Sequence, residues 1–468
     1  MADEMEKVKD SKQLPGNTLP GIMTYARAKE LVDLPDEEYS PPALPYKRVQ
    51  FDPKTEFGSS KIREHFCIDF DNWTFINHGA FGGALAAALE TVHQIQIYIE
   101  RQPLRFVDRE LIPHMVYVIR RLAGFVSCDP RDLVLVSNAT EGLNTVIRSL
   151  KFGKGDRVYY LNTRYYAVNK LFVHLKEENG IEIQEVPISF PSSSEEILNT
   201  ITQTLHPDTK LAIFGHIPSV HPIVLPIGKI IEICHNKGVQ VLIDGAHALG
   251  AIPLDLTSLN ADYYVMNCHK WLCNPKGCAA LYVNKKYQEN IRCLTVSGGF
   301  GRGFTPEFIF RGLKDYSSFL ALHTVSTLPD FYCIIKFIIL VLDFWQTLGP
   351  DNIRSYITNL AHKAGTMLAD KWQTDTLFPV AMYGPMVLVR LPDILWQSRN
   401  DNNPVTHAIA EDIQNLLYYN YGIEVPIKPI NGRLYCRISA HVYNEMKDYH
   451  VFADAVCELT EQTVINEK

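Results

Sequence analysis

The sequence lacks an excess of basic residues, a Cys-x-x-Cys pair and an apolar run long enough to span a membrane. Its 468 residues carry 45 Lys and Arg against 52 Asp and Glu, which gives a formal charge of −7. Nucleic-acid binding needs a clustered basic face, so the composition argues against a nucleic-acid partner and favours small-molecule chemistry. The most apolar run, FYCIIKFIILVLDFW at 331–345, contains Lys336 and Asp343. It predicts a buried helix rather than a membrane segment.

The cysteines and the first residues bear on the compartment. The ten cysteines form no Cys-x-x-Cys pair, which is typical of free thiols in a reducing compartment. The opening MADEMEKVKDSKQLPG is charged and lacks the apolar core of a secretory signal. We therefore expect a cytoplasmic protein without a membrane partner. Residues 1–60, rich in Pro, Asp, Glu and Lys, are expected to form a flexible leader that is loose or drapes over the body.

Short apolar segments alternate with amphipathic ones along the rest of the chain. This alternation predicts an α/β fold with a mainly parallel seven-stranded sheet that helices flank. The expected strands are 132–136, 157–161, 181–186, 210–215, 239–243, 262–266 and 278–283. We expect a large domain at 61–330, a linking helix at 331–349 and a small C-terminal α/β domain at 350–468. The strands expected in the small domain are 386–391, 423–427 and 434–439.

Polar residues follow four of the predicted strands, where open parallel sheets bind ligands. Thr140 in SNATEG begins a predicted helix; the unpaired N–H groups there suit a phosphate, although a simple helix cap is the alternative. Asp244 in DGAHALG could hold a cationic ring nitrogen, or only cap a turn. The pair Tyr165–Tyr166 could stack on a planar ligand, or be two half-buried tyrosines.

The fourth polar group is Lys270, enclosed between a histidine and a tryptophan in NCHKW. A lysine in a low-dielectric cleft loses part of its charge and becomes an amine able to form a Schiff base; a solvated surface lysine is the alternative. Taken together, a phosphate cradle, a ring-nitrogen carboxylate, a stacking aromatic ring and such a lysine are what pyridoxal 5′-phosphate requires.

The order of these features along the chain resembles that of the class V aminotransferase family of fold type I pyridoxal-phosphate enzymes, and within it the isopenicillin N epimerase-like branch. The resemblance covers roughly residues 65–460. It implies the fold type I architecture, pyridoxal 5′-phosphate as cofactor, an amino-acid substrate and a homodimer. The motifs that carry it are NHGAFGG (77–83), SNATEGLN (137–144), DGAHALG (244–250), NCHKWLCNPKG (267–277), FRGLKDYSSFLAL (310–322) and RISAHVYN (437–444).

The resemblance also implies roles for individual residues. Lys270 would form the Schiff base and then move the α-proton, and Asp244 would pair with the pyridinium nitrogen. Arg437 would bind the substrate carboxylate through its planar guanidinium, with Asn77 and His78 in the loop that usually reaches the substrate. The other implied cofactor contacts are Ala139, Thr140, Tyr166, Ser219, His247, Asn267 and His269.

One position departs from the family pattern. Its Gly-Thr-x-Asp motif reads here Gly312-Leu313-Lys314-Asp315, so the threonine that usually reaches the cofactor phosphate of the partner subunit is missing. This puts that cross-subunit contact in doubt without excluding a dimer.

The reaction type is less defined by the sequence than the cofactor. We favour β-elimination from cysteine or a thioether, as in a C–S lyase or cysteine desulfhydrase. Epimerisation and transamination begin with the same removal of the α-proton and stay open. A desulfurase needs a persulfide-forming cysteine on a mobile loop, whereas Cys333, Cys436 and Cys457 fall in apolar helix or strand patterns.

Three rival interpretations remain to be weighed. A zinc site on Cys268, Cys273 and Cys278 lacks the usual C-x2-C knuckle, so no metal is expected. The glycines of GGFGRGF (298–304) do not fit the G-x-G-x-x-G pattern of nicotinamide-binding enzymes. An inactive scaffold that keeps the fold as a binding module is the third rival, against which stands the presence of every residue needed for the Schiff base and the electron sink.

Overall fold

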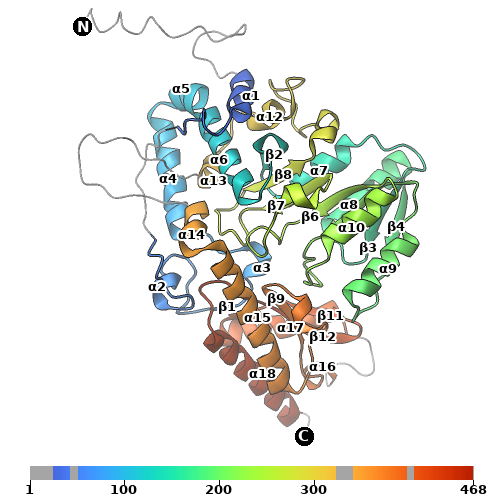
Figure 1. Cartoon of the computed structure of the whole chain (residues 1–468). Coiled ribbons are helices and arrows are strands. Elements are labelled where there is room, and N and C mark those ends of the chain that lie inside the picture. The colour runs from blue at the N-terminus through green and yellow to red at the C-terminus, as the bar shows by residue number, and fades with distance from the viewer. Residues whose placement is uncertain (1–24, 43–50, 323–340, 398–404, 467–468) are drawn as a thin grey trace, which may run out of the picture.

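The computed structural model describes residues 25–42, 51–322, 341–397 and 405–466. The described chain forms a larger lobe around a seven-stranded sheet and a smaller lobe around a three-stranded one, the smaller lying below in Figure 1. No helix within these residues is long and apolar enough to cross a membrane.

The large sheet confirms the predicted α/β architecture. Its strand order is β2-β8-β7-β6-β5-β3-β4. Neighbouring strands from β7 to β4 run parallel, whereas β8 is antiparallel to both β7 and β2. The strands are β2 (Leu133–Val136), β3 (Arg157–Leu161), β4 (Glu182–Val186), β5 (Thr209–Gly215), β6 (Gln240–Asp244), β7 (Tyr263–Asn267) and β8 (Ala279–Val283), each close to its predicted range.

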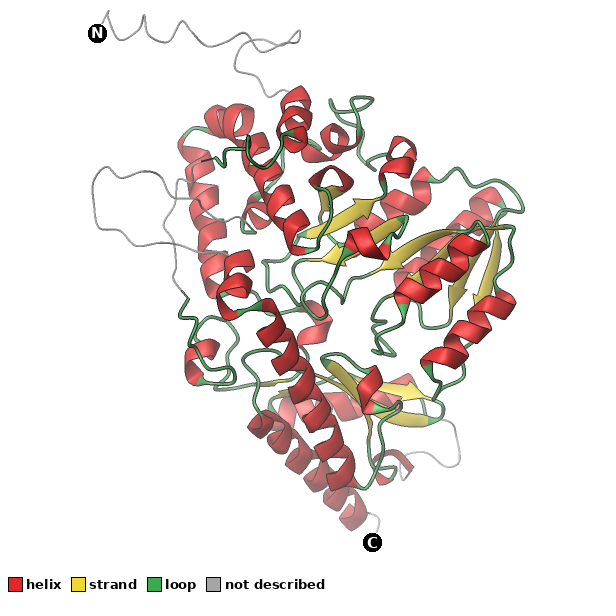
Figure 2. Ribbon diagram, in the orientation of Figure 1, coloured by secondary structure: helices red, strands yellow, loops and turns green. Residues whose placement is uncertain are grey.

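Both faces of this sheet are covered by helices, as Figure 2 shows. Alternate residues of one strand belong to different cores: Leu133 and Leu135 pack in one, Val134 and Val136 in the other. Because side chains alternate between faces along a strand, a strand buried on both sides reads as an unbroken apolar run. The covering helices include α6 (Leu111–Phe125), α7 (Ala139–Ser149), α8 (Tyr166–Asn179), α9 (Ser194–Thr204) and α10 (Ile227–Asn236).

The small lobe contains an antiparallel sheet in the order β11-β12-β9. Helices α15, α17 and α18 surround it (Figure 1). The elements are β9 (Met386–Arg390), β11 (Ile427–Ile430), β12 (Arg433–Ser439), α15 (Pro350–Trp372), α17 (His407–Tyr421) and α18 (Met446–Asn466).

The single strand predicted at 423–427 is wrong. It divides into β10 (Ile423–Glu424), which pairs in parallel with β1 (Thr74–Phe75), and β11, which begins at Ile427. Pro426 lies between them, and proline cannot donate a ladder hydrogen bond. The pairing of β1 with β10 connects the segment that precedes Asn77 to the small lobe.

Part of the expected leader is a helix that packs on the body. Helix α1 (Tyr25–Asp33) buries Ala28, Leu31 and Val32 and lies against α6 and α12 (Phe304–Ile309). Arg120 on α6 donates to the carbonyl of Leu34 at 2.7 Å. These residues therefore drape over the large lobe.

The expected linking helix is described only in its second half. Residues 323–340 lie outside the described residues; α14 (Val341–Leu348) follows them and ends before Gly349. The boundaries expected at 61, 331 and 350 stay predictions.

Candidate active site

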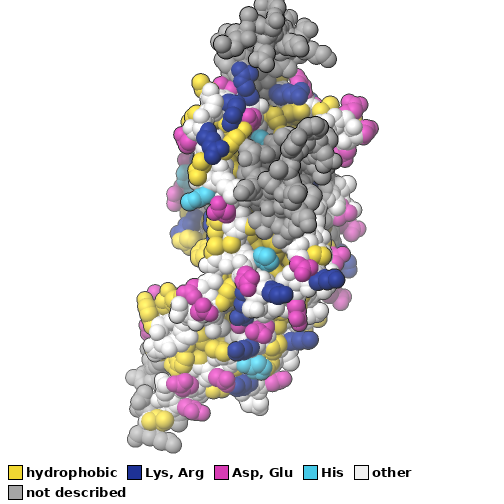
Figure 3. Space-filling view, turned by 90° about the vertical axis from the view of Figure 1, so that its left-hand side faces the viewer, with side chains coloured by type: hydrophobic (Ala, Val, Ile, Leu, Met, Phe, Trp, Pro, Cys, Tyr) yellow, Lys and Arg dark blue, Asp and Glu magenta, His cyan; other side chains and the backbone are white. Residues whose placement is uncertain are grey.

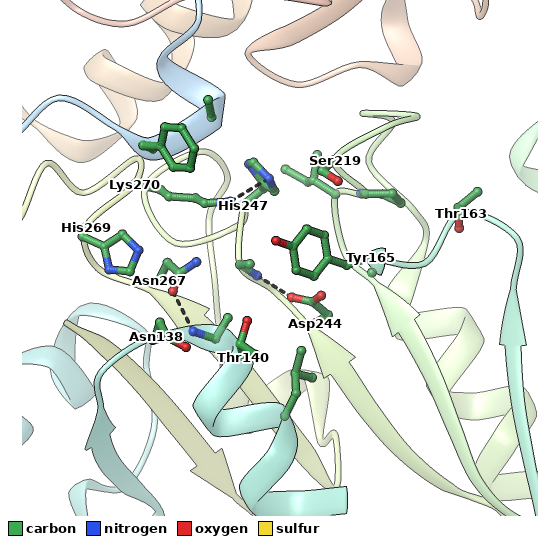
Figure 4. Close-up of a pocket in the computed structure, with 18 residues that line it drawn as sticks. Asn138, Thr140, Thr163, Tyr165, Ser219, Asp244, His247, Asn267, His269 and Lys270 are labelled. Carbon is green, nitrogen blue, oxygen red and sulfur yellow. Dashed lines mark hydrogen bonds between the residues drawn. The ribbon is translucent and has the colours of Figure 1, made fainter. Parts of the chain in front are cut away.

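The carboxyl ends of the parallel strands surround a cavity of about 180 Å³ (Figure 4). Its lining comes from the turns after β2, β3, β5, β6 and β7, together with the short helix α3 (His78–Phe81). Of the residues expected at a site, the cavity brings together Ala139, Thr140, Ser219, Asp244, His247, Asn267, His269 and Lys270.

Lys270 follows β7, and its side chain extends into the cavity (Figure 4). Burial lowers the pKa of its amine to about 8; Asp244 opposes this shift and Arg437 adds to it. Its Nζ lies 3.0 Å from Nε2 of His247, whose Nδ1 accepts from the indole of Trp271 at 3.3 Å. A substantial fraction of Lys270 is therefore the nucleophilic amine near neutral pH.

Asp244 ends β6 and faces the same cavity (Figure 4). Burial raises the pKa of its carboxyl, against the opposing effects of the Ala246 N–H and Lys270. The Ala246 amide donates to Oδ1 at 3.1 Å. The ring of Tyr264 packs closely against the turn that follows Asp244. A Cβ on Gly245 would lie 2.2 Å from this ring, so this position requires glycine.

The N-terminus of α7 forms one wall of the cavity. The side chain of Asn138 caps it by accepting from the N–H of Glu141 at 2.9 Å. The amide of Ala139, one of the expected cofactor contacts, donates to Oδ1 of Asn267 at 2.9 Å. The N–H of Thr140, at the second helical position, has no protein acceptor among the described residues. The amide and hydroxyl of Thr140 are therefore the free donors at this helix end.

His269 lies beside this helix end, next to Asn267 (Figure 4). Its Nδ1–H donates to the carbonyl of Cys278 at 2.7 Å, which leaves Nε2 as the ring nitrogen without a bond. Burial lowers the pKa of His269 to about 4, so the imidazole is neutral in the free protein.

The tyrosine that lines the cavity is Tyr165, whereas Tyr166, the first choice from the sequence, is not among the lining residues. Tyr165 lines the cavity and its ring points inward (Figure 4). Tyr166 is 68% exposed, with Nζ of Lys170 5.3 Å from its ring centre. The physical reason is that Tyr165 is the extended N-cap residue of α8, whereas Tyr166 is already helical and turns away.

Arg437 on β12 is buried beside this cavity but does not line it. Its Nη1 donates to the carbonyl of Ser219 at 2.7 Å, and its Nη2 donates to Oδ1 of Asn77 at 3.2 Å. Its buried Nε has no partner, and burial lowers its pKa to about 10. Asn77 in turn donates to Glu424 at 3.3 Å. Asn77 thus orients the guanidinium.

His78 is not among the residues that line the cavity, although Ala80 and Phe81 of the same short helix are. It is fully buried: its Nε2–H donates to the carbonyl of Lys270 at 3.1 Å, and its Nδ1 accepts from Tyr443 at 2.7 Å. Gly82 also lies against the lysine segment, since a Cβ there would be 2.4 Å from the carbonyl of His269. These contacts support the backbone that carries Lys270.

The cysteines of the NCHKWLCNPKGC segment do not surround a common point. The thiol of Cys273 lies 3.3 Å from Nε2 of His441. The thiol of Cys278 instead forms a hydrogen bond with the thiol of Cys268. The ligand atoms of His78, Cys273 and His441 do lie within 4.8 Å of one another. However, the two imidazoles are stacked at 4.0 Å, and His441 donates to the carbonyl of Trp271 at 3.2 Å. The cluster is thus a hydrogen-bonded support beneath Lys270.

Several lining residues were missed from the sequence. Asn138 was part of the SNATEG motif but received no role, and only the capping geometry distinguishes it from its neighbours. Phe81 lines the cavity although it is 76% exposed. Thr163 precedes Tyr165 in the turn after β3 and carries no sequence signal of its own.

Comparison with known proteins adds an independent line of observation. The aminotransferase class-V family model matches residues 110–319. The chain is 29% identical to a probable chloroplastic L-cysteine desulfhydrase of Arabidopsis thaliana, with 88% of each chain covered. It is 26% identical to isopenicillin N epimerase of Streptomyces clavuligerus, covering 82% of this chain and 94% of that one.

Solved structures share the fold. The cystine C–S lyase C-DES, solved with its product cysteine persulfide, matches with a TM-score of 0.67 at 19% identity. The match covers 83% of this chain and 97% of that one.

Proposed function

We propose that this chain is a member of the aminotransferase class-V family of fold type I enzymes and a pyridoxal 5′-phosphate-dependent C–S lyase acting on L-cysteine or a cysteine thioether. The observation that carries the proposal is the placement of the Lys270 amine, 3.0 Å from His247, in one cavity with the buried carboxyl of Asp244.

The residues present fit this cofactor. The free N–H and hydroxyl of Thr140 at the start of an 11-residue helix provide donors and positive potential for a phosphate. Asp244, whose pKa is raised by burial and whose carboxyl forms no ion pair with a described residue, suits a protonated ring nitrogen. Tyr165 presents its ring to the same cavity, close to Asp244 (Figure 4). Asn267, Ser219, His247 and His269 complete the polar lining.

The reaction follows from the charges of these side chains. When bound, pyridoxal 5′-phosphate supplies an electron sink for the α-carbon of an amino acid. Asp244 would hold the ring nitrogen in its protonated form through its negative charge. Lys270 would hold the cofactor through its side-chain amine, and that amine, once free, would accept the proton from the substrate's α-carbon. Arg437 orients the substrate through its carboxylate.

Elimination is favoured over sulfur transfer to a protein thiol because no cysteine is among the described residues that line the cavity. Cys436 is fully buried in β12, and Cys457 lies on α18. Cys333 lies outside the described residues. Relatives named L-cysteine desulfhydrase support the same preference. A relative named isopenicillin N epimerase keeps epimerisation as the second candidate.

The test begins with the purified protein incubated with pyridoxal 5′-phosphate. We expect an absorbance band near the edge of the visible range that borohydride bleaches, and its loss in Lys270→Ala. The holoenzyme is then given a panel of amino acids while pyruvate, sulfide and α-deuterium exchange are measured. Pyruvate with sulfide or thiol supports the lyase, exchange alone supports the epimerase, and a ketoacid with the aminated cofactor supports a transaminase. A colourless protein supports the inactive scaffold.

We further infer that the protein is a homodimer. Apolar side chains are exposed at Phe81, Val296, Phe300 and Leu313, the last 79% exposed where the family has its threonine. Exposed apolar side chains that form one contiguous patch would mark the interface of such a dimer. Light scattering of the purified protein tests this, with Leu313→Glu expected to shift the mass towards the monomer.

We also propose a cytoplasmic location and no nucleic-acid partner. The nine described cysteines are free thiols, as expected in a reducing compartment. On the face that Figure 3 shows, acidic and basic side chains are interspersed over the small lobe. Cell fractionation followed by immunoblotting, and a filter-binding assay with DNA and RNA, test the two statements.

A further inference from the structure

One face of the small-lobe sheet is turned towards the cavity. Residues opposite each other in neighbouring strands share a face, which pairs Lys428 with Tyr435 and Arg437 with Leu388. Tyr435 and Arg437 are two positions apart on β12, so both pairs lie on the same face. The same face meets the large lobe, since Arg437 donates to the Ser219 carbonyl. Lys428 and Arg437 are diagonal neighbours across β11 and β12, which places their Cα atoms about 7–8 Å apart.

The cations on this face differ in their counter-charges. Arg390, opposite Tyr435, lies 3.2 Å from carboxylate oxygens of both Asp375 and Asp393. Lys428 and Arg437, by contrast, form no ion pair with any carboxylate in the described ranges 25–42, 51–322, 341–397 and 405–466. Two neighbouring cations are therefore left uncompensated beside the cavity.

The surroundings of Lys428 make this arrangement costly for the free protein. Its side chain is half-buried, and burial together with the charge of Arg437 lowers its pKa. Arg437 is itself buried, with its Nε lacking a partner. A buried cation without an anion destabilises the fold, so both side chains are arranged for anionic groups that arrive with a ligand.

We propose that Lys428 forms a subsite for a second acidic group, carried by the side chain of the substrate. This inference rests on the proposed function, in which Arg437 takes the α-carboxylate. One carboxylate is satisfied by the two-pronged guanidinium, so the half-buried ammonium next to it is available to another. The substrates would be cysteine thioethers whose S-substituent ends in a carboxylate.

A matched pair of ligands tests the subsite. S-(2-carboxyethyl)-L-cysteine and S-(2-carbamoylethyl)-L-cysteine have the same shape and differ only in the terminal charge. Dissociation constants are measured from the absorbance change of the holoenzyme on mixing, and KM and kcat from pyruvate release. A charged hydrogen bond contributes enough for the wild type to bind the acid about tenfold more tightly than the amide.

Variants then assign the preference to Lys428. Lys428→Met is expected to weaken binding of the acid about tenfold, with the amide and kcat unchanged, and Lys428→Arg to keep the preference. Lys447→Met, at an exposed lysine of α18, is the control. Equal binding of acid and amide by the wild type overturns the proposal. Equal weakening of both ligands by Lys428→Met also overturns it, because Lys428 would then serve the α-carboxylate.

The binding measurement separates this proposal from the proposed function. If the acid binds more tightly than the amide but neither yields pyruvate, the lyase assignment fails and the subsite stands. If both yield pyruvate without a preference in binding, the lyase assignment stands and the subsite fails.

Discussion

Trp271 donates its indole N–H to Nδ1 of His247 across 3.3 Å, while Nε2 of the same imidazole lies 3.0 Å from Nζ of Lys270. Burial and the neighbouring Lys270 charge keep the pKa of His247 well below its usual value, so the ring is neutral and carries one proton. Since Nδ1 accepts from Trp271, this proton belongs on Nε2. Nε2–H can donate to Nζ only if the lysine is an amine, so Trp271 favours the nucleophilic form of Lys270.

Replacing Trp271 tests this relationship. Trp271→Phe removes the indole donor and lets the imidazole place its proton on Nδ1, so that Nε2 can accept from an ammonium. A hydrogen bond contributes about 1 kcal/mol, so the pKa governing cofactor capture should rise by roughly 0.7 of a unit. The rate of appearance of the absorbance band at different pH values measures it. Trp345→Phe, which removes a buried indole bond to the Leu272 carbonyl, should leave the profile unchanged; an equal shift in both variants would disprove the tautomer argument.

The wild-type protein should capture its cofactor faster as the pH rises. The pKa of Lys270 is lowered to about 8 by burial, and the amine is the reacting form. About one tenth of Lys270 is therefore the amine at pH 7 and about nine tenths at pH 9, which predicts a roughly tenfold faster capture at pH 9. Stopped-flow mixing of cofactor-free protein with pyridoxal 5′-phosphate measures the rate. A midpoint near the ordinary lysine value would contradict the burial of this amine.

The two adjacent tyrosines should behave differently. Tyr165→Ala removes the ring that lines the cavity and should weaken cofactor binding about tenfold, because an aromatic stacking contact is worth about 0.5–1.5 kcal/mol beyond the area it buries. Tyr166→Ala, at an exposed ring, should leave affinity unchanged. Fluorescence titration of the cofactor-free variants gives both constants. A larger loss of cofactor affinity in Tyr166→Ala than in Tyr165→Ala would favour Tyr166, the residue chosen from the sequence.

Removing the carboxylate charge of Asp244 should impair the chemistry more than the fold. Asp244→Asn keeps an acceptor for the Ala246 amide but loses the negative charge that holds a ring nitrogen protonated. Breaking a buried ion pair costs about 3–5 kcal/mol, so α-deuterium exchange should slow by at least roughly 100-fold. Asp255→Asn, at an exposed helix cap, is the control. If Asp244→Asn exchanged α-deuterium at the wild-type rate, the negative charge of this carboxylate would not be required for the reaction.

Two glycines with positive φ separate a steric effect from backbone strain. Gly82 (φ +71°) and Gly155 (φ +85°) both disfavour a side chain, but only at Gly82 would a Cβ meet other atoms, 2.4 Å from the His269 carbonyl. Gly155→Ala should lower the free energy of unfolding by about 1–2 kcal/mol, and Gly82→Ala by about 2–4 kcal/mol because a clash is added. Urea denaturation measures both, and equal losses would exclude the clash.

The sheet was predictable because its strands are buried on both faces. Segments such as LVLV and YYVM are apolar throughout and are separated by amphipathic helices, a pattern that occurs mainly in covered parallel sheets. The residues after the strands were predictable as candidates for the same reason, because the carboxyl ends of parallel strands meet at one edge. Lys270, Asp244, His247 and Thr140 were chosen in this way, and all four line the same cavity.

Other features depend on contacts that no local pattern contains. The choice between Tyr165 and Tyr166 is decided by which residue is the N-cap of α8. The inward burial of His78 depends on Tyr443, 365 positions away. The division of the predicted strand at 423–427 depends on pairing with Thr74–Phe75. Each required the tertiary structure, since the partner residues are distant in the chain.

The support beneath Lys270 has a consequence for biosynthesis. His78 binds the carbonyl of Lys270, 192 positions away, and the hydroxyl of Tyr443, 365 positions away, so groups far apart in the sequence support the lysine segment. A ribosome-bound chain that has emerged only as far as Lys270 lacks Tyr443, His441 and Arg437. The support can therefore be completed only after Tyr443 has been synthesised, and we expect the cofactor to be acquired after that point.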